Sequence, residues 1–261
     1  MSAAGSLRLN GAPNFRDLGD SDLGDRRLIR GKVFRSGHFG RLTPDDVDKL
    51  KQIPLRTIVD LRADFETQLF VSSIPIDAGI AVVNVVTNPY AGASGDAYKA
   101  ILRDDPTPGG ALKTITATYQ LLPAACGPAL KAVIDLILDG GAPLVFHCSN
   151  GRDRTGVISM MLQHLLGVSR DIIVADYVAS NARIDIESAV VLSRTVFIKE
   201  FGIDFSDETL RSMNQALAQN VETTINTIHS QYGSTDHYFD SFGINGQRRK
   251  ALHNVMLEGT Q

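Results

Sequence analysis

The sequence predicts an α/β fold, in which a central and mostly parallel sheet is flanked by helices. Short apolar runs typical of buried strands alternate with longer segments of helical periodicity. Charged or polar residues directly follow two of these runs, where the carboxyl ends of parallel strands would form a ligand site. Beyond residue 170 the periodicity is helical, which predicts a helical C-terminal region.

The first half of the chain supplies the expected strands. They are predicted where β-branched and aromatic residues cluster, over residues 32–37, 56–62, 79–86 and 143–146. Thr43 can cap a helix whose first position is Pro44. Two further helices are expected at 112–122 and 128–138. Residues 88–110 have weak periodicity and are expected to form a long surface excursion that is partly helical.

The second half supplies helices, expected over residues 157–166, 170–179, 187–201, 207–231 and 247–257. The third and fourth of these follow in series and can form a hairpin. We expect residues 182–231 to act either as a lid over a site or as an ordinary packed helix pair. The sequence alone favours the packed pair.

Composition narrows the function classes. The chain has 261 residues, of which 43% are hydrophobic and 21% charged, as is ordinary for soluble proteins. We expect one domain over residues 1–261, with a flexible N-terminus at 1–12. The net charge of −3 argues against non-specific nucleic-acid binding. No apolar run stands out as long enough to span a membrane, so we expect no transmembrane segment.

One stretch has residue types suited to catalysis. It covers residues 143–156, Pro-Leu-Val-Phe-His-Cys-Ser-Asn-Gly-Arg-Asp-Arg-Thr-Gly. A short apolar strand ends in His147-Cys148, and a helical pattern begins after Arg154. A loop in front of a helix N-terminus points backbone N–H groups inward and forms a nest for a tetrahedral oxyanion. Gly151 lets this backbone turn where a Cβ would obstruct it.

Cys148 and Arg154 have types and spacing that suit phosphoryl transfer. Arg154 supplies a planar fork that can hold two phosphate oxygens at once. Thiols in such electropositive loops have pKa values of about 3.5–7.5, which favours the thiolate. A thiolate that faces a bound phosphate is a nucleophile, so we expect Cys148 to attack phosphorus.

The loop resembles a known signature. Residues 147–156, His-Cys-(five residues)-Arg-Thr-Gly, are similar to the motif of cysteine-dependent phosphatases. With the inner pair Arg152-Asp153, the loop resembles the His-Cys-x-x-Gly-Lys-Asp-Arg-Thr-Gly loop of the atypical bacterial tyrosine phosphatases, the mycobacterial protein tyrosine phosphatase B-like group. This chain has Arg152 where that family usually has Lys, so the charge is kept and the shape changes.

Flanking stretches resemble the same family in the same order. They are Asn14-Phe15-Arg16-Asp17-Leu18-Gly19, Arg35-Ser36-Gly37, Asp60-Leu61-Arg62 followed by Glu66, and Asp176-Tyr177-Val178-Ala179-Ser180-Asn181. The resemblance covers residues 14–257. It implies a phosphatase-type sheet and a phosphocysteine intermediate. In the family's best-known member an inserted helix pair acts as a lid.

The resemblance assigns the general acid to Asp153, inside the loop, with Asp60 or Asp64 in reserve. An aspartate in a cationic nest normally has a lowered pKa, which conflicts with an acid role unless burial or bound phosphate raises it. His147 is expected to orient the cysteine loop. Thr155 is expected to hydrogen-bond the thiolate or to cap the helix.

The remaining candidates bind or support phosphate. Arg152 is expected to add a cation at the loop rim, which suits phosphoinositides or other polyanions. Asp60 and Arg62 either line the site wall or form an ion pair that closes the strand end. The phosphate cradle is expected from the loop residues Ser149, Asn150, Gly151, Arg152, Asp153 and Arg154, with Thr155 after them.

We therefore expect a phosphoric monoester hydrolase that acts on phosphotyrosine, without metal or cofactor. By resemblance, phosphoserine, phosphothreonine and phosphoinositides are further substrates. One alternative is a non-catalytic phosphate-binding module, although Cys148 and Asp153 are both present. The other is a thiol-based arsenate reductase or sulfurtransferase. Arsenate reduction generally needs resolving cysteines, and the only other cysteine, Cys126, is expected to be an inert core or cap-region thiol.

Location is inferred from two features. Met1–Gly11 has no apolar core of a signal peptide. A structural disulfide between Cys126 and Cys148 would remove the nucleophile, so a reducing compartment fits. We expect a cytoplasmic protein. Secretion without a classical signal peptide is the alternative, since relatives in pathogens are exported in that way.

Overall fold

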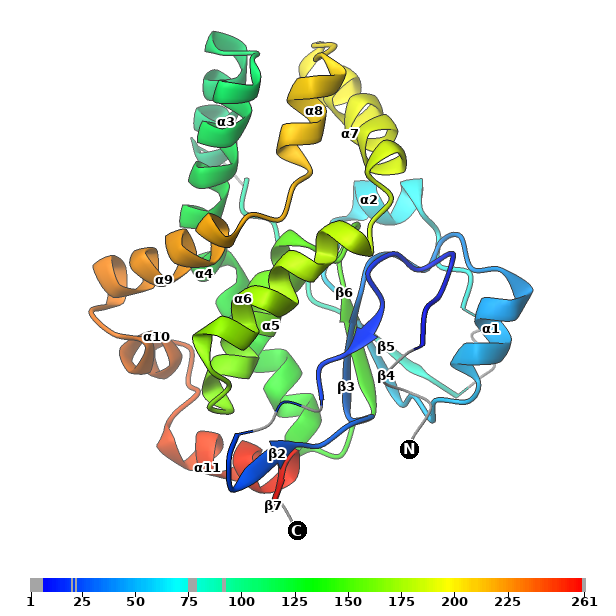
Figure 1. The fold of residues 1–261 in the computed structure, drawn as a ribbon, viewed down its shortest axis with the longest axis vertical. Helices are drawn as coiled ribbons and strands as arrows, with labels where there is room; N and C mark the ends of the chain where they lie inside the picture. Colours follow the sequence, from blue (N-terminus) through cyan, green and yellow to red (C-terminus); the bar gives the residue numbers. More distant parts are fainter. Residues whose placement is uncertain (1–6, 20, 22, 75–78, 91–92, 260–261) are drawn as a thin grey trace.

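The computed structural model describes residues 7–19, 21, 23–74, 79–90 and 93–259. Its centre is a five-stranded sheet of order β1-β3-β6-β4-β5, in which only the edge strand β1 is antiparallel to its neighbour (Figure 1). These strands are β1 (Arg16–Asp17), β3 (Val33–Ser36), β6 (Leu144–His147), β4 (Thr57–Asp60) and β5 (Ala81–Asn84). The predicted α/β fold with a mostly parallel sheet is confirmed.

The parallel strands end at one level. Ser36 of β3 and Asp60 of β4 both pair with His147 of β6, and Asn84 of β5 pairs with Asp60. The carboxyl ends therefore form one edge of the sheet, and Cys148 follows β6 directly at this edge. Ligands of parallel sheets bind at such edges.

Alternate strand residues pack on opposite faces of the sheet. Leu144 and Phe146 belong to the larger hydrophobic core, whereas Val145 belongs to a second core. The larger core is covered by helices that include α4 (Pro108–Leu138), α5 (Asp153–Leu165), α6 (Arg170–Val178), α10 (Thr235–Ser241) and α11 (Gly246–Met256). The opposite face carries α1 (Pro44–Leu50), which begins at the predicted Thr43 cap (Figure 1).

α4 is one continuous helix of 31 residues, where the sequence predicted two shorter helices. Pro123 and Pro128 lie inside it, and neither has the N–H that an interior helical residue donates. The Pro123 carbonyl accepts a hydrogen bond from the Tyr238 hydroxyl at 2.9 Å. At Gly127 the helix lies so close to Phe242 that an added Cβ would be 2.2 Å from the ring. Tertiary packing therefore carries the helix through a stretch whose local sequence favours a break.

By length and composition alone, α4 could also cross a membrane, an apolar length that the sequence analysis did not recognise. The expectation that the chain has no transmembrane segment stays a prediction. In this structure half of the most apolar stretch of α4 is buried. The buried residues of α4 belong to the larger core, and α5 packs against the helix. α4 is thus a core helix of this fold.

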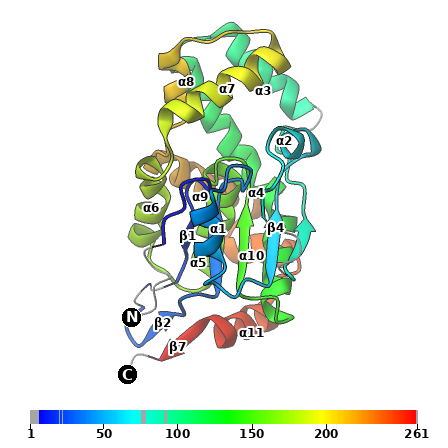
Figure 2. The same cartoon turned by 90° about the vertical axis from the view of Figure 1, so that its right-hand side faces the viewer.

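The C-terminal helical segment divides into two parts. α7 (Ile186–Phe201) and α8 (Asp207–Met213) extend beyond the carboxyl ends of the strands, together with α3 (Ala93–Asp104) (Figures 1 and 2). We call these three helices the cap. α9 (Ala218–Tyr232) packs instead against α4 and α6. The single helix expected over residues 207–231 is thus broken between α8 and α9.

Three smaller segments bear on further expectations. The surface excursion expected at residues 88–110 contains α3, in agreement with its expected helical part. The strand expected to be buried at 79–86 is the edge strand β5, in which Val82 is 58% exposed. In the N-terminus that was expected to be flexible, the N–H groups of Asn10 and Gly11 each donate to the Asp46 carboxylate at 2.8 Å. Residues 1–6 of that call lie outside the described residues.

The sequence did not predict a second, two-stranded sheet near the ends of the chain. It pairs β2 (Arg26–Leu28) with β7 (Leu257–Gly259) in antiparallel register. β7 directly follows α11, whose position as the closing helix was predicted. The last described strand is thereby joined to the first thirty residues of the fold.

Candidate active site

The predicted phosphate loop connects β6 to α5. It turns at Gly151, which has a φ of +68°. An added Cβ there would lie 2.4 Å from the carbonyl carbon of Ser36, so glycine is required for the loop to approach β3. α5 begins at Asp153, directly after the loop. The partial positive charge of its N-terminus therefore lies beside the loop that contains Cys148.

Behind the loop, a buried network holds the Gly151 carbonyl. Asn14 Nδ2 and Arg35 NH2 donate to this oxygen at 2.7 and 2.8 Å. Arg35 also pairs with Asp176 of α6 at 2.7 Å, and Arg16 pairs with the second oxygen of Asp176 at 2.7 Å. We call Asn14, Arg16, Arg35 and Asp176 the floor cluster.

The charges of the floor cluster are shielded from solvent. Arg35 is 0% exposed. Burial alone would raise the pKa of Asp176, but the charges of Arg35 and Arg16 outweigh burial and lower it. Burial lowers the pKa of Arg16 to about 10, so Arg16 is still a cation at neutral pH. Three of the four flanking stretches that resemble the phosphatase family thus meet behind the loop, where they fix its backbone.

Arg154 is held by α2 (Asp64–Leu69). Its NH1 and NH2 donate to the two oxygens of Glu66 at 2.7 and 2.5 Å, and Glu66 also accepts from Ser149 Oγ at 2.6 Å. Burial would raise the pKa of Glu66, but the pairing with Arg154 reverses the effect and lowers it. Within the described part of the chain, Arg154 Nε bonds to no acceptor. The Nε–NH2 edge of its guanidinium is therefore available to a ligand.

Asp153 lies between Arg152 and Tyr119. Arg152 Nε and NH2 donate to its two oxygens at 2.9 and 3.0 Å, and the Tyr119 hydroxyl donates to Oδ1 at 2.6 Å. Burial would raise the pKa of Asp153, but Arg152 and the Tyr119 hydrogen bond outweigh it and lower the pKa. The carboxyl group is therefore ionised at neutral pH in the unliganded protein.

A chain of hydrogen bonds leads from α9 to Asp153. Asn220 Nδ2 donates to the Tyr177 hydroxyl at 2.8 Å, and the hydroxyls of Tyr177 and Tyr119 bond to each other. Because the Tyr119 hydroxyl donates to Asp153, its oxygen accepts from Tyr177. Burial raises the pKa of Tyr177 to about 12, so its proton is retained at neutral pH. The sequence did not indicate Tyr119, which falls within the apolar pattern of α4.

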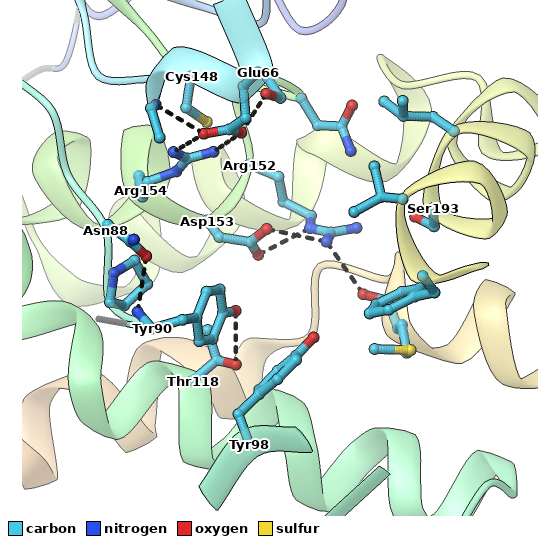
Figure 3. Close-up of a pocket in the computed structure, with 18 of the residues that line it drawn as sticks. Glu66, Asn88, Tyr90, Tyr98, Thr118, Cys148, Arg152, Asp153, Arg154 and Ser193 are labelled. Atoms are coloured by element: carbon cyan, nitrogen blue, oxygen red, sulfur yellow. Dashed lines mark hydrogen bonds and ion pairs between the residues drawn. The ribbon is translucent and has the colours of Figure 1, made fainter. Parts of the chain in front are cut away.

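The loop residues open into a cavity of about 350 Å³ beneath the cap (Figure 3). Cys148, Asp153 and Arg154 all line it, and Figure 3 shows the sulfur beside the paired Glu66 and Arg154. The upper walls are mainly apolar and aromatic, with Phe65, Tyr90, Tyr98, Ile115, Val196 and Phe197. Among the residues the structure describes, no group of three or more His, Cys, Asp or Glu side chains could hold a metal ion.

Comparison with known proteins decides the family. A family model described as the tyrosine phosphatase family matches residues 7–258. The chain belongs to the tyrosine phosphatase family. It is 27% identical over 276 residues to the triple specificity protein phosphatase PtpB of Mycobacterium tuberculosis, covering 95% of this chain and 98% of that protein. It is also 26% identical over 235 residues to a Cupriavidus necator protein named as a presumed tyrosine-protein phosphatase, covering 86% of this chain and 79% of that protein.

Among solved structures, this tyrosine phosphatase matches TpbA of P. aeruginosa. A TpbA variant in complex with phosphotyrosine has a TM-score of 0.32 and 11% identity, covering 80% of this chain and 94% of that chain. Another TpbA crystal structure has a TM-score of 0.32 and 14% identity, covering 72% and 90%. The protein is thus an enzyme, a hydrolase of phosphoric monoesters whose family acts on phosphotyrosine.

In this phosphatase, Arg152 lines the cavity, but it is paired with Asp153 and does not extend from an exposed loop rim as the sequence predicted. Its side chain is buried, and beyond Asp153 it donates to Asn214 Oδ1 at 3.2 Å and to the Met213 carbonyl at 3.1 Å. Both acceptors lie at the end of α8. The helix break frees the Met213 carbonyl, because the last carbonyls of a helix have no intrahelical donor. Arg152 therefore links the phosphate loop to the cap.

Asp60 and Arg62 lie behind the phosphatase loop and do not line the cavity. Arg62 Nε and NH2 donate to Asp60 at 2.8 and 2.6 Å, so the pair closes the end of β4. His147 Nε2 lies 3.7 Å from Asp60, and His147 Nδ1 lies 3.2 Å from the Cys148 carbonyl. Burial lowers the pKa of His147 to about 4, so the ring is neutral and supports the loop. Asp64, the other reserve acid, is exposed on α2.

Two remaining predictions concern Thr155 and Cys126. Thr155 Oγ1 is buried without a hydrogen-bond partner in the described structure, and no side chain caps α5. Neither expected role of Thr155 is therefore shown. Cys126 is buried in α4, its Sγ lies 3.8 Å from the Arg154 carbonyl, and burial raises the pKa of its thiol. These features agree with the inert core thiol that was predicted.

Proposed function

We propose that this phosphatase uses Cys148 as its nucleophile and passes through a phosphocysteine intermediate. The observation that supports this most strongly is that Cys148, Asp153 and Arg154 line one cavity, beside the N-terminus of α5. A thiol, a carboxyl and a guanidinium together supply the nucleophile, the proton carrier and the cation that phosphoryl transfer needs.

In the proposed first step the Cys148 thiolate attacks phosphorus, and the bond from phosphorus to the phenolic oxygen breaks. Asp153 gives its proton to that oxygen, so tyrosine leaves as a neutral alcohol. In the second step water attacks the phosphocysteine and gives one proton to Asp153. The sulfur–phosphorus bond breaks, inorganic phosphate leaves, and the thiolate is restored.

Arg154 is proposed to bind two oxygens of the transferred group. Glu66 occupies the NH1–NH2 end of the guanidinium, which orients the Nε–NH2 edge for a bidentate contact. Charge develops on these oxygens as the phosphoryl group moves between donor and acceptor. A guanidinium that is already oriented stabilises this charge without reorganisation.

The proton of Asp153 needs an explanation, because the group is ionised in the unliganded protein. A bound phosphate dianion places negative charge beside the carboxylate and raises its pKa. Arg152 and Tyr119 act in the opposite direction, since both stabilise the ionised form. We propose that these two residues set the pH at which Asp153 carries its proton in the substrate complex.

The aromatic and apolar cavity walls favour phosphotyrosine, whose ring can pack against Tyr90 or Phe197 while its phosphate reaches Cys148. The relative in M. tuberculosis is named as a triple specificity protein phosphatase. We therefore propose that phosphoserine, phosphothreonine and phosphoinositides are further substrates, because each carries a phosphoric monoester that the same loop can bind.

The first experiment is hydrolysis of a small aryl phosphate by the wild type, Cys148→Ser and Cys126→Ala, in reductant and chelator. We expect kcat to fall about 10⁴-fold or more in Cys148→Ser and to stay within about threefold in Cys126→Ala. Trapped phosphocysteine after rapid quenching of the wild type would support the intermediate. Equal activity of the two variants, or phospholigand binding without any turnover, would overturn the proposal.

A further inference from the structure

A second cavity, of about 380 Å³, lies beside the catalytic one. The two cavities share Phe70, Asn150 and Leu192 in their linings. Asn150 belongs to the phosphate loop, two residues after Cys148. A compact ligand with one group at Cys148 can therefore place a neighbouring group in the second cavity.

Arginines are prominent in the lining of the second cavity. Arg8, Arg41 and Arg183 line it, with Asp185 as the carboxylate. Across the described ranges, neither Arg41 nor Arg183 pairs with a carboxylate. By contrast, Arg154 in the catalytic cavity is paired with Glu66. Two cations without counter-ions beside the loop create a field that favours an anionic ligand.

The other polar groups are placed to donate hydrogen bonds. The Arg41 guanidinium lies 5.3 Å from the centroid of the Phe70 ring, and the His38 ring stacks on Phe70 at 4.0 Å. His38 Nδ1 accepts from the Gly40 N–H at 3.1 Å, so Nε2 carries the proton of the neutral ring. Burial, then Arg62 and Arg41, lower the pKa of His38 to about 4, which agrees with a neutral donor.

Asp185 reduces this positive field but is already engaged. It caps α7, and its carboxylate accepts from the Ser188 N–H at 3.3 Å and from Ser188 Oγ at 2.5 Å. The N-terminus of α7, a helix of 16 residues, therefore adjoins the cavity. Its dipole adds to the attraction for an anion, and the arginines still exceed the single carboxylate in charge.

We propose that the second cavity is a subsite for a second phosphate of the substrate, read by Arg41 and Arg183. The inference rests on the proposed function, because it places the first phosphate at Cys148. A single ligand that spans both cavities must cross their shared wall of Phe70, Asn150 and Leu192 and carry its two phosphates close together. A ring that carries phosphates on nearby carbons, as in the inositol phosphates, meets this requirement.

The test measures binding in the Cys148→Ser background by calorimetry, so it does not depend on turnover. The probes are inositol 1-phosphate and inositol 1,3-bisphosphate. We expect the bisphosphate to bind more tightly than the monophosphate. The double variant Arg41→Met with Arg183→Met should raise the Kd of the bisphosphate by about tenfold or more. Asp185→Asn, which keeps a helix cap, should tighten bisphosphate binding by about twofold.

A matched control removes two arginines elsewhere. Arg26 and Arg56 are exposed and do not line either cavity. Arg26→Met with Arg56→Met should leave the Kd of the bisphosphate unchanged within about twofold. With Cys148 intact, the Arg41 and Arg183 variant should keep its kcat/KM for an aryl phosphate within about twofold, since neither residue touches the aryl phosphate site.

Several results would overturn the subsite. One is equal affinity of the wild type for the two inositol phosphates. Another is an equal loss with both arginine pairs, which would indicate net charge alone. A third is a loss seen with a peptide carrying two adjacent phosphotyrosines and not with the bisphosphate. A fourth is a loss confined to a short-chain phosphoinositide, which would assign the arginines to the lipid surface. If the wild type did not hydrolyse an aryl phosphate while the bisphosphate still bound, this result would count against the proposed function instead.

Discussion

The floor cluster and the cap contact the phosphate loop from opposite sides and by different means. In the floor, Arg16, Arg35 and Asp176 are charged, largely buried and bonded to one another. In the cap, Arg194 of α7 pairs with Asp204 and Asp207, whose side chains are 64% and 57% exposed. The ion pairs of the floor are therefore buried, whereas those of the cap are exposed and its buried contacts include apolar ones, as with Phe197 and Leu210.

The difference assigns separate tasks to the two regions. A buried charge that loses its partner is strongly destabilising, so the floor has one favourable arrangement. Surface ion pairs contribute little to stability, so the ion pairs of the cap can change without loss of the fold. We expect the floor to govern stability and turnover, and the cap to govern access to the cavity.

The largest predicted effect tests the floor against the cap. Asp176→Asn should lower the free energy of unfolding by about 3–5 kcal/mol, because it leaves Arg16 and Arg35 buried without a carboxylate. The matched cap variant, Asp204→Asn, should lower it by less than about 1 kcal/mol. Urea unfolding at neutral pH measures both.

This comparison has a pH signature. The folded-state pKa of Asp176 is lowered, so its contribution is present above the unfolded value of about 3.9 and is lost as pH falls through the folded value. The difference between wild type and Asp176→Asn should therefore shrink in acid. Equal losses in Asp176→Asn and Asp204→Asn would break the contrast between floor and cap.

The next effect tests whether the floor sets the loop geometry. Gly151→Ala should lower kcat/KM for an aryl phosphate by about 100-fold, because the added Cβ pushes the loop away from Ser36. Gly167→Ala is the control. Gly167 has a φ of +82°, but nothing lies within 4 Å of an added Cβ. Gly167→Ala should lower the stability somewhat and change the activity per folded molecule little. A similar loss of activity in Gly151→Ala and Gly167→Ala would refute the steric argument.

The smallest expected effect concerns Tyr119 of α4, whose hydroxyl donates to Asp153 at the end of the phosphate loop. Tyr119→Phe removes a hydrogen bond that stabilises the ionised form of Asp153, so the pKa of Asp153 should rise. The alkaline limb of kcat/KM for a poor leaving group should move to higher pH by about 0.5–1 unit. Tyr238→Phe, which removes a buried hydroxyl bonded to Pro123, is the control and should not move the limb. An unmoved limb in Tyr119→Phe would separate Tyr119 from the acid.

Much of the fold and the centre of the site could be predicted from the sequence. β6, the loop and α5 are adjacent in the chain, so strand periodicity and the Cys148 to Arg154 spacing suffice to predict them. Thr43 and Pro44 likewise predict the start of α1 from local chemistry. Local rules work where the partners of a residue are its chain neighbours.

The failures occur where distant segments decide the outcome. α4 continues through Pro123 and Pro128 because it is packed on both sides, which no local rule can register. Arg152 has the charge and spacing of a rim cation, but Asn214 and Met213 draw it inward. The sequence pattern around Tyr119 predicts only a core aromatic residue, because its contact with Asp153 joins it to a segment later in the chain.

The pairing of segments that are far apart in the chain also determines the order in which these contacts can form during translation. Translation completes the phosphate loop and its proposed nucleophile at residue 156, when Asp176 does not yet exist and Arg16 and Arg35 do not yet have their carboxylate partner. β2 likewise has no partner strand until β7, far later in the chain, has been made. Contacts between such distant segments form late in folding. The enzyme thus acquires its proposed nucleophile early and completes the floor cluster late, so a chain terminated before Asp176 carries Cys148 without all of the contacts that hold the phosphate loop.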